Sequence, residues 1–162
     1  MLVSEAIEKI RRRINDEFDT GYSDEVLINY INDAKEYLSH ALIARFSPEL
    51  TEYITVDSTI TNNVPTNFVK FCGGFPVRRQ GNLFFITDTT LPIVEVKYFF
   101  IPDDVLAVTD NMPFQNNDTY NMLIINLASI YALNQHEFDV NQDSALKQAI
   151  EGMIDNALGG IE

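Results

Sequence analysis

Apolar residues recur every three or four positions in four separate segments of the chain, which is the spacing of an amphipathic helix. These segments predict helices at about residues 4–15, 23–46, 118–134 and 142–158. The second helix is the longest, and its apolar face consists of Leu27, Ile31, Ala34, Leu38, Ala41 and Leu42. The pattern therefore predicts two helices at the start of the chain and two at its end.

Between the second and third helices the apolar period changes from about four to two. Residues 50–101 are rich in branched and aromatic side chains and are divided by turn-forming residues, as in antiparallel strands. The turn formers Gln80-Gly81-Asn82 lie between Val77-Arg78-Arg79 and Leu83-Phe84-Phe85 and predict a hairpin turn. We expect a small sheet of three to five strands. The fold class is thus α+β, one domain over residues 1–162, with about four helices and an antiparallel sheet inserted between helices two and three.

The predicted third helix is apolar on nearly all of its faces, from about Tyr120 to Leu133. Such a helix is either enclosed by its own fold or covered by a neighbouring subunit. In a chain of this size we expect partial burial in an interface. The candidate contacts with another subunit are Tyr120, Ile124 and Tyr131, together with Met153 of the fourth helix. Asp118 is the expected cap of the third helix.

The chain is strongly acidic, with 11 basic and 24 acidic residues and a formal net charge of −13. This balance disfavours direct binding to nucleic acid or to an anionic membrane, because both require clustered cations. Residues 103–162 contain ten acids and Lys147 as their single cation. Two interpretations stay open, a solvated face that favours solubility and a field with a function of its own.

The composition also limits where the protein is expected. Cys72 is the single cysteine, so no intrachain disulfide can form, as is usual in a reducing compartment. The first residues lack the basic and apolar regions of a signal peptide. The longest apolar run, residues 122–133, is shorter than the roughly 20 residues that span a bilayer. A soluble, intracellular protein is therefore expected, with no membrane association.

No familiar catalytic motif is present, and no cofactor is expected. His40 has no His or Cys at helical spacing. His136 could join Glu137 and Asp139 in a metal site, but adjacent ligands on a short segment rarely close a coordination sphere. The Gly-Gly pair at 73–74 is not followed by the Lys-Ser/Thr of a phosphate-binding loop. The sequence thus predicts a protein that is not an enzyme.

Other polar groups have structural interpretations. The triple arginine at 11–13 ends the first helix, where cations interact favourably with the helix dipole, and phosphate binding is the alternative. The aspartates at 103–104 follow a proline, as in a solvated turn. Asn32 and Asp33 are expected to pair with a neighbouring element rather than to act in catalysis. Ser23 has the chemistry of an N-cap for the second helix.

The order of these elements, together with two motifs, resembles a known family. The segment from Tyr22 through Ser23-Asp24-Glu25-Val26-Leu27 to Tyr30-Ile31-Asn32-Asp33-Ala34 is similar to the start of tailed-phage head–tail connector proteins, also called adaptor or head-completion proteins. The later segment around Pro65 and Phe68 is similar to the element that opens their sheet. The resemblance covers the N-terminal half by motif and the C-terminal helices by layout.

The resemblance implies a structural, non-catalytic virion protein that is made in the host cytoplasm. It implies a ring of about twelve copies that docks on the portal protein, extends the DNA channel and meets the next neck or tail protein. DNA would pass through this channel without specific binding. Acids that line the lumen would then repel the duplex, and the candidates are Glu137, Asp139, Asp143, Glu151 and Asp155. The alternatives are another neck or tail-completion protein and a soluble bacterial binding or regulatory module.

Overall fold

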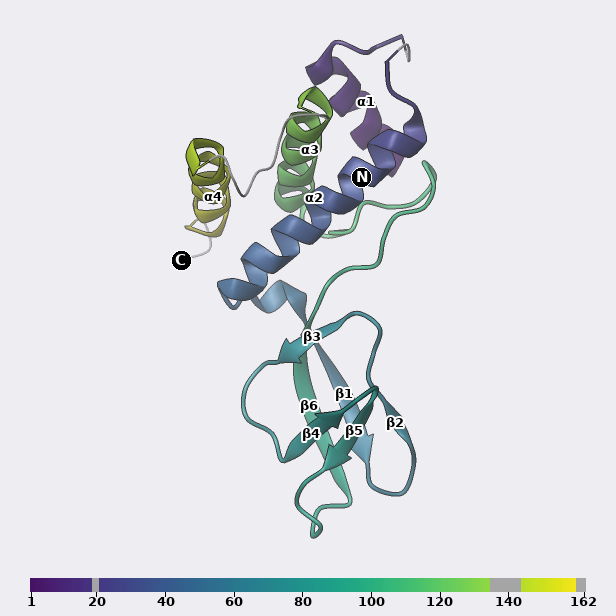
Figure 1. The fold of residues 1–162 in the computed structure, drawn as a ribbon, viewed down its shortest axis with the longest axis vertical. Helices are drawn as coiled ribbons and strands as arrows, with labels where there is room; N and C mark the ends of the chain where they lie inside the picture. Colours follow the sequence, from purple (N-terminus) through teal and green to yellow (C-terminus); the bar gives the residue numbers. More distant parts are fainter. Residues whose placement is uncertain (19–20, 135–143, 160–162) are drawn as a thin grey trace. The chain divides into compact units, whose positions relative to one another are not determined.

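The computed structural model of the chain describes residues 1–18, 21–134 and 144–159. It contains four helices and six strands, with all strands between the second and third helices (Figure 1). The helices are α1 (Val3–Ile14), α2 (Asp24–Ala44), α3 (Asp118–Leu133) and α4 (Ser144–Gly159). The predicted α+β class is confirmed, and each helix begins and ends within about two residues of its predicted position.

The chain divides into two compact units where one domain was predicted. The helical unit consists of Met1–Ala41 and Asp103–Glu162, and the β unit consists of Leu42–Pro102. The inserted strands form a separate unit because they bury an apolar core of their own. Its buried members are Val56, Val77, Phe84, Val94 and Val96.

In the helical unit, α1 buries the stripe that its apolar spacing predicts. Its apolar buried residues are Val3, Ala6, Ile7, Ile10 and Ile14. The helix ends at Asn15, whose φ of 57° is left-handed, a conformation that asparagine adopts more readily than most residues. The opposite end is fixed by Glu5, whose carboxylate accepts the Leu2 N–H at 2.9 Å.

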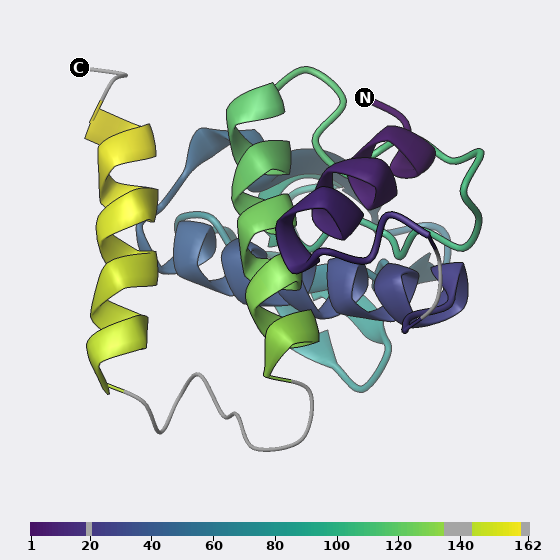
Figure 2. The same cartoon turned by 90° about the horizontal axis from the view of Figure 1, so that it is seen from above.

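Helix α3 lies between α1 and α4 (Figure 2) and contacts both. Its buried residues occupy most of the circumference of the helix, so the chain itself covers much of the apolar surface that was assigned to a neighbouring subunit. These residues are Tyr120, Asn121, Leu123, Ile124, Ile125, Leu127, Ala128, Ser129 and Ala132. One face stays half-buried or exposed, the face of Thr119, Met122, Asn126, Ile130 and Leu133. The cap is Asn117 rather than Asp118, because the Asn117 side chain accepts the Tyr120 N–H at 3.2 Å.

The β unit contains two three-stranded antiparallel sheets. One has the order β1-β6-β3 and the other the order β2-β5-β4. Their bounds are β1 Thr51–Asp57, β2 Asn62–Asn63, β3 Phe68–Phe71, β4 Val77–Gln80, β5 Leu83–Ile86 and β6 Ile93–Phe100. Gly81 joins β4 to β5 with φ of 61°, which confirms the predicted hairpin and explains the glycine.

The two units differ in charge. The helical unit contains nineteen acids and six basic residues, so it carries the whole net charge of −13. The β unit contains five acids and five basic residues and is neutral. Several of its cations lie over aromatic rings, as Lys97 does over Tyr53 at 5.6 Å from the ring centroid. The acidity seen in the sequence is thus a property of the helices.

Candidate functional site

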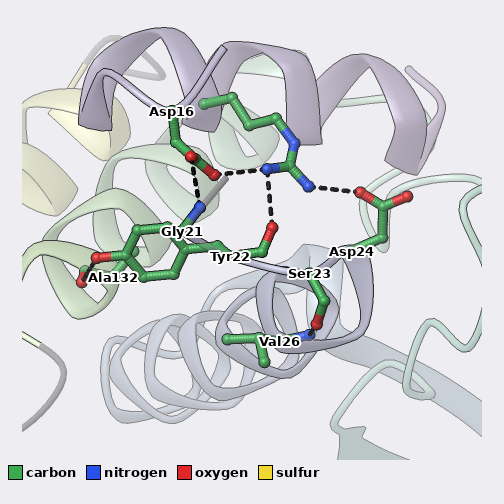
Figure 3. A network of polar contacts seen from close by, with 8 residues as sticks. Asp16, Gly21, Tyr22, Ser23, Asp24, Val26 and Ala132 are labelled. Carbon is green, nitrogen blue, oxygen red and sulfur yellow. Dashed lines mark hydrogen bonds and ion pairs between the residues drawn. The ribbon is translucent and has the colours of Figure 1, made fainter. Parts of the chain in front are cut away.

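A buried arginine organises the connection between α1 and α2. The Nη1 group of Arg11 donates to the Asp16 carboxylate at 2.7 Å and to the Tyr22 carbonyl at 2.9 Å. Its Nη2 group donates to the Asp24 carboxylate at 2.7 Å (Figure 3). The second Asp16 oxygen accepts the Gly21 N–H at 2.9 Å. Arg11 and Asp16 are both buried. Charge-assisted bonds of this kind are directional and therefore fix the path of the turn.

The three arginines lie in the last turn of α1, as expected, but Arg11 is buried. Arg11 follows Ile7 by four positions and precedes Ile14 by three, so it lies on the buried side of α1. Arg12 is exposed, and the Arg13 guanidinium donates to the side chain of Asn126 on α3. The three cations thus have three different environments, and Arg11 is committed to the interior of the helical unit.

Two further contacts tie the start of α2 to its surroundings (Figure 3). The Tyr22 hydroxyl donates to the Ala132 carbonyl at 2.7 Å, which links the turn to the last turn of α3. The Ser23 hydroxyl accepts the Val26 N–H at 3.2 Å, so the predicted N-cap is confirmed. The turn is therefore bonded to α1, α2 and α3 together.

The segment that leads into α3 is held by two asparagines from different helices. Asn32 of α2 donates to the Val105 carbonyl and accepts the Val105 N–H, both at 2.9 Å. Asn121 of α3 donates to the Phe114 carbonyl at 2.7 Å and accepts the Phe114 N–H at 3.2 Å. Each amide satisfies both backbone groups of one residue, as a paired strand would. The expectation that Asn32 pairs with a neighbouring element is confirmed.

The segment around and after Val105 is also held by hydrogen bonds and an ion pair. Asp110 accepts the N–H groups of Leu106 and Ala107 at 2.8 and 2.9 Å. The Val3 N–H donates to the Asp110 carbonyl at 2.9 Å, and Lys35 of α2 forms an ion pair with Asp104. We call residues 103–111 the pinned loop. It is a surface loop whose backbone is bonded to α1 and α2.

The pinned loop should loosen in acid. Its N–H groups at Leu106 and Ala107 hold the pKa of Asp110 below its ordinary value of 3.8. A carboxyl with a lowered folded-state pKa stabilises the fold above its unfolded pKa and loses that effect as the pH falls through the folded value. We expect both amides to lose protection from hydrogen exchange below about pH 3.8. Asp110→Ala should remove the protection at neutral pH, and Asp103→Ala should not. Equal protection in both variants would contradict this assignment.

The four residues predicted to contact another subunit differ in their solvent exposure. Tyr120 and Ile124 are 1% and 0% exposed, so the chain itself covers them and they offer no surface to a partner. Tyr131 and Met153 are half-buried. The interface hypothesis is therefore left with Tyr131 and Met153 as its surface-accessible members.

Two of the five acids predicted to line the channel lie in the part of the chain that the structure describes. Asp155 is exposed and Glu151 is half-buried on α4. Glu137, Asp139 and Asp143 lie outside the described residues, as does the metal site suggested for His136. Both described acids are accessible enough to act on a charged neighbour.

Possible metal-ligating side chains do not gather in the described part of the chain. Within residues 1–18, 21–134 and 144–159, no group of three or more His, Cys, Asp or Glu side chains is placed to hold a metal ion. His40 is exposed, with Nε2 3.8 Å from the Glu36 carboxylate, and Cys72 is half-buried. In the same part of the chain, no helix combines the length and apolar character that crossing a membrane requires.

Comparison with known proteins assigns no family to this chain. No protein-family model and no curated protein matches its sequence. Function is therefore argued from the bonded turn around Arg11 and from the pinned loop.

Proposed function

We propose that the chain is a head–tail connector of a tailed phage or prophage. In this function it docks on the portal protein as a ring of about twelve copies, extends the DNA channel and joins the head to the next neck or tail protein. One observation supports this most. The residues that resemble the connector motif help to build the helical unit, since Tyr22, Asp24 and Asn32 each make a long-range polar contact in it.

The apolar residues of the same motif support the proposal too. Leu27, Ile31 and Ala34 are all fully buried. A motif made of core and bridging residues specifies a scaffold and not a reaction. A rigid scaffold suits a subunit whose task is to hold a channel in register while DNA moves through it.

The charge of the helical unit fits a channel that DNA passes without sticking. A ring multiplies the −13 of each copy, and an acidic wall repels the phosphate backbone over about one Debye length, roughly 8 Å at physiological salt. If α4 faces the lumen, Glu151 and Asp155 contribute to that wall. Electron microscopy of an assembled ring checks this, because an Asp155 that points away from the channel excludes it.

Light scattering tests the proposal with the purified chain and the portal protein of the same phage genome. We expect the chain to co-elute with the portal and to add the mass of several copies per portal ring. A chain that stays monomeric and does not bind the portal would favour a bacterial binding or regulatory module. Binding to a later neck component without the portal would favour the tail-completion alternative.

A further inference from the structure

The pinned loop carries one apolar side chain that is largely exposed to solvent. Leu106 is 82% exposed, although the residues on both sides of it are fixed. Asn32 holds both backbone groups of Val105, and Asp110 holds the N–H groups of Leu106 and Ala107. A side chain whose backbone is already ordered loses little entropy on binding, which is how anchor residues of interfaces are prepared. Nothing inside the described chain uses the Leu106 side chain.

The β unit has a hollow whose lining combines apolar side chains with the polar residues Ser58, Thr61 and Asn62. It lies beside β5 and has a volume of about 240 Å³. Two of its lining residues are large and exposed, Ile60 at 63% and Phe85 at 41%. An apolar cavity of about 150 Å³ is enough to take up a benzene molecule, so this hollow is large enough for a leucine side chain.

Each feature has a charged side chain of opposite sign beside it. Asp103 and Asp104 precede Leu106 and are exposed, and Asp104 also pairs with Lys35. On the β unit, residues 58–87 contain Lys70, Arg78 and Arg79 and no acid, although Asp57 precedes this stretch and bonds to Asn62 of the hollow. The Arg78 guanidinium lies 6.0 Å from the centroid of the Phe85 ring, which places a cation beside the hollow.

From these features we infer that Leu106 of one copy docks into the hollow at Ile60 and Phe85 of a neighbouring copy, with the loop aspartates facing Arg78. This inference rests on the proposed function, because it names the contact between subunits of the ring. A contact that joins two different surfaces of the same chain is heterologous, and its repetition closes a ring when the rotation permits. A second copy is the occupant we choose, because both complementary halves belong to this chain.

Disulfide trapping tests the contact directly. One protein carries Ala107→Cys and a second, with a larger tag, carries Thr61→Cys, both with Cys72→Ser, so that Leu106 and Ile60 stay in place. The matched control pair carries Leu133→Cys and Tyr53→Cys, at exposed side chains (60% and 64%) outside the two features. After mixing and oxidation we expect about tenfold more mixed dimer from the Ala107 and Thr61 pair, the factor that one interface anchor is worth. The excess should shrink at high salt, because the flanking charges are then screened. A yield no higher than that of the control pair overturns the inference.

A second experiment separates this inference from the proposed function. Leu106→Asp should abolish ring formation on the portal, and Leu133→Asp should leave it unchanged. If wild type forms the ring and both variants do so equally, the Leu106 contact is wrong and the connector function stands. If wild type itself fails to assemble on the portal, the proposed function fails as well.

Discussion

Replacing Arg11 with methionine should lower the free energy of unfolding by about 3–5 kcal/mol, because it leaves the buried Asp16 carboxylate without its cation. Methionine retains most of the apolar stem of arginine, so the loss reports on charge and hydrogen bonding more than on packing. The matched control is Arg12→Met, at the neighbouring exposed position, which we expect to change stability by no more than about 0.5 kcal/mol. Urea unfolding followed by circular dichroism measures both variants.

A partner substitution makes this prediction more specific. Adding Asp16→Asn to Arg11→Met should recover part of the lost stability, because it removes a buried negative charge that has lost the Arg11 guanidinium. The asparagine carbonyl can still accept the Gly21 N–H that Asp16 binds at 2.9 Å. If Arg11→Met is no more harmful than Arg12→Met, Arg11 does not organise the turn.

The second large loss in the free energy of unfolding is expected for substitutions of Asn121, which is fully buried in α3. Asn121→Leu keeps the approximate volume but leaves the Phe114 N–H without its partner, while the Phe114 carbonyl still accepts the Asn117 N–H at 3.1 Å. An unsatisfied buried polar group costs about 1–3 kcal/mol, so a loss of about that size is expected. Asn29→Leu is the control, because Asn29 is exposed on α2.

The variant Asn121→Asp separates hydrogen bonding from size. A carboxylate can accept the Phe114 N–H, but it cannot donate to the Phe114 carbonyl and repels it instead. We therefore expect this variant also to be destabilised in urea unfolding. Wild-type stability in both Asn121 variants would show that the Phe114 clamp contributes nothing.

Local patterns predict the elements of this fold well. The four helices follow from apolar spacing, and the hairpin at Gly81 follows from the turn formers Gln80-Gly81-Asn82 between two short segments, because helix and turn preferences act over a few residues. Within α1, the spacing of Arg11 from Ile7 and Ile14 carried a signal for burial. Burial of Arg11 was not predicted, because three consecutive arginines at a helix end favour an interaction with the helix dipole.

Contacts between distant segments could not be predicted in the same way. The bond from Tyr22 to Ala132 and the bonds from Asn32 to Val105 join residues far apart in the chain, and no local pattern encodes their pairing. Asn121 was a partial exception, since a polar side chain amid an apolar helix must find a partner once it is buried. The division into two units was missed because it depends on whether the strands bury a core of their own.

The bonded turn and the pinned loop connect three helices of the helical unit to one another and to a surface loop. The Arg11 contacts fix α1 to α2, the Tyr22 hydroxyl fixes the turn to α3, and Asn32 fixes the loop that displays Leu106. Motif residues thus connect the core of the subunit to a surface that we assign to assembly. In the proposed function, this link joins the scaffold motif to the surface that forms the ring.

The most direct test of the connector proposal is electron microscopy of portal rings incubated with an excess of the purified chain. The account predicts an added ring of density, coaxial with the portal channel, with one copy of the chain for each portal subunit or nearly so. Portal particles that look the same with and without the chain would contradict it.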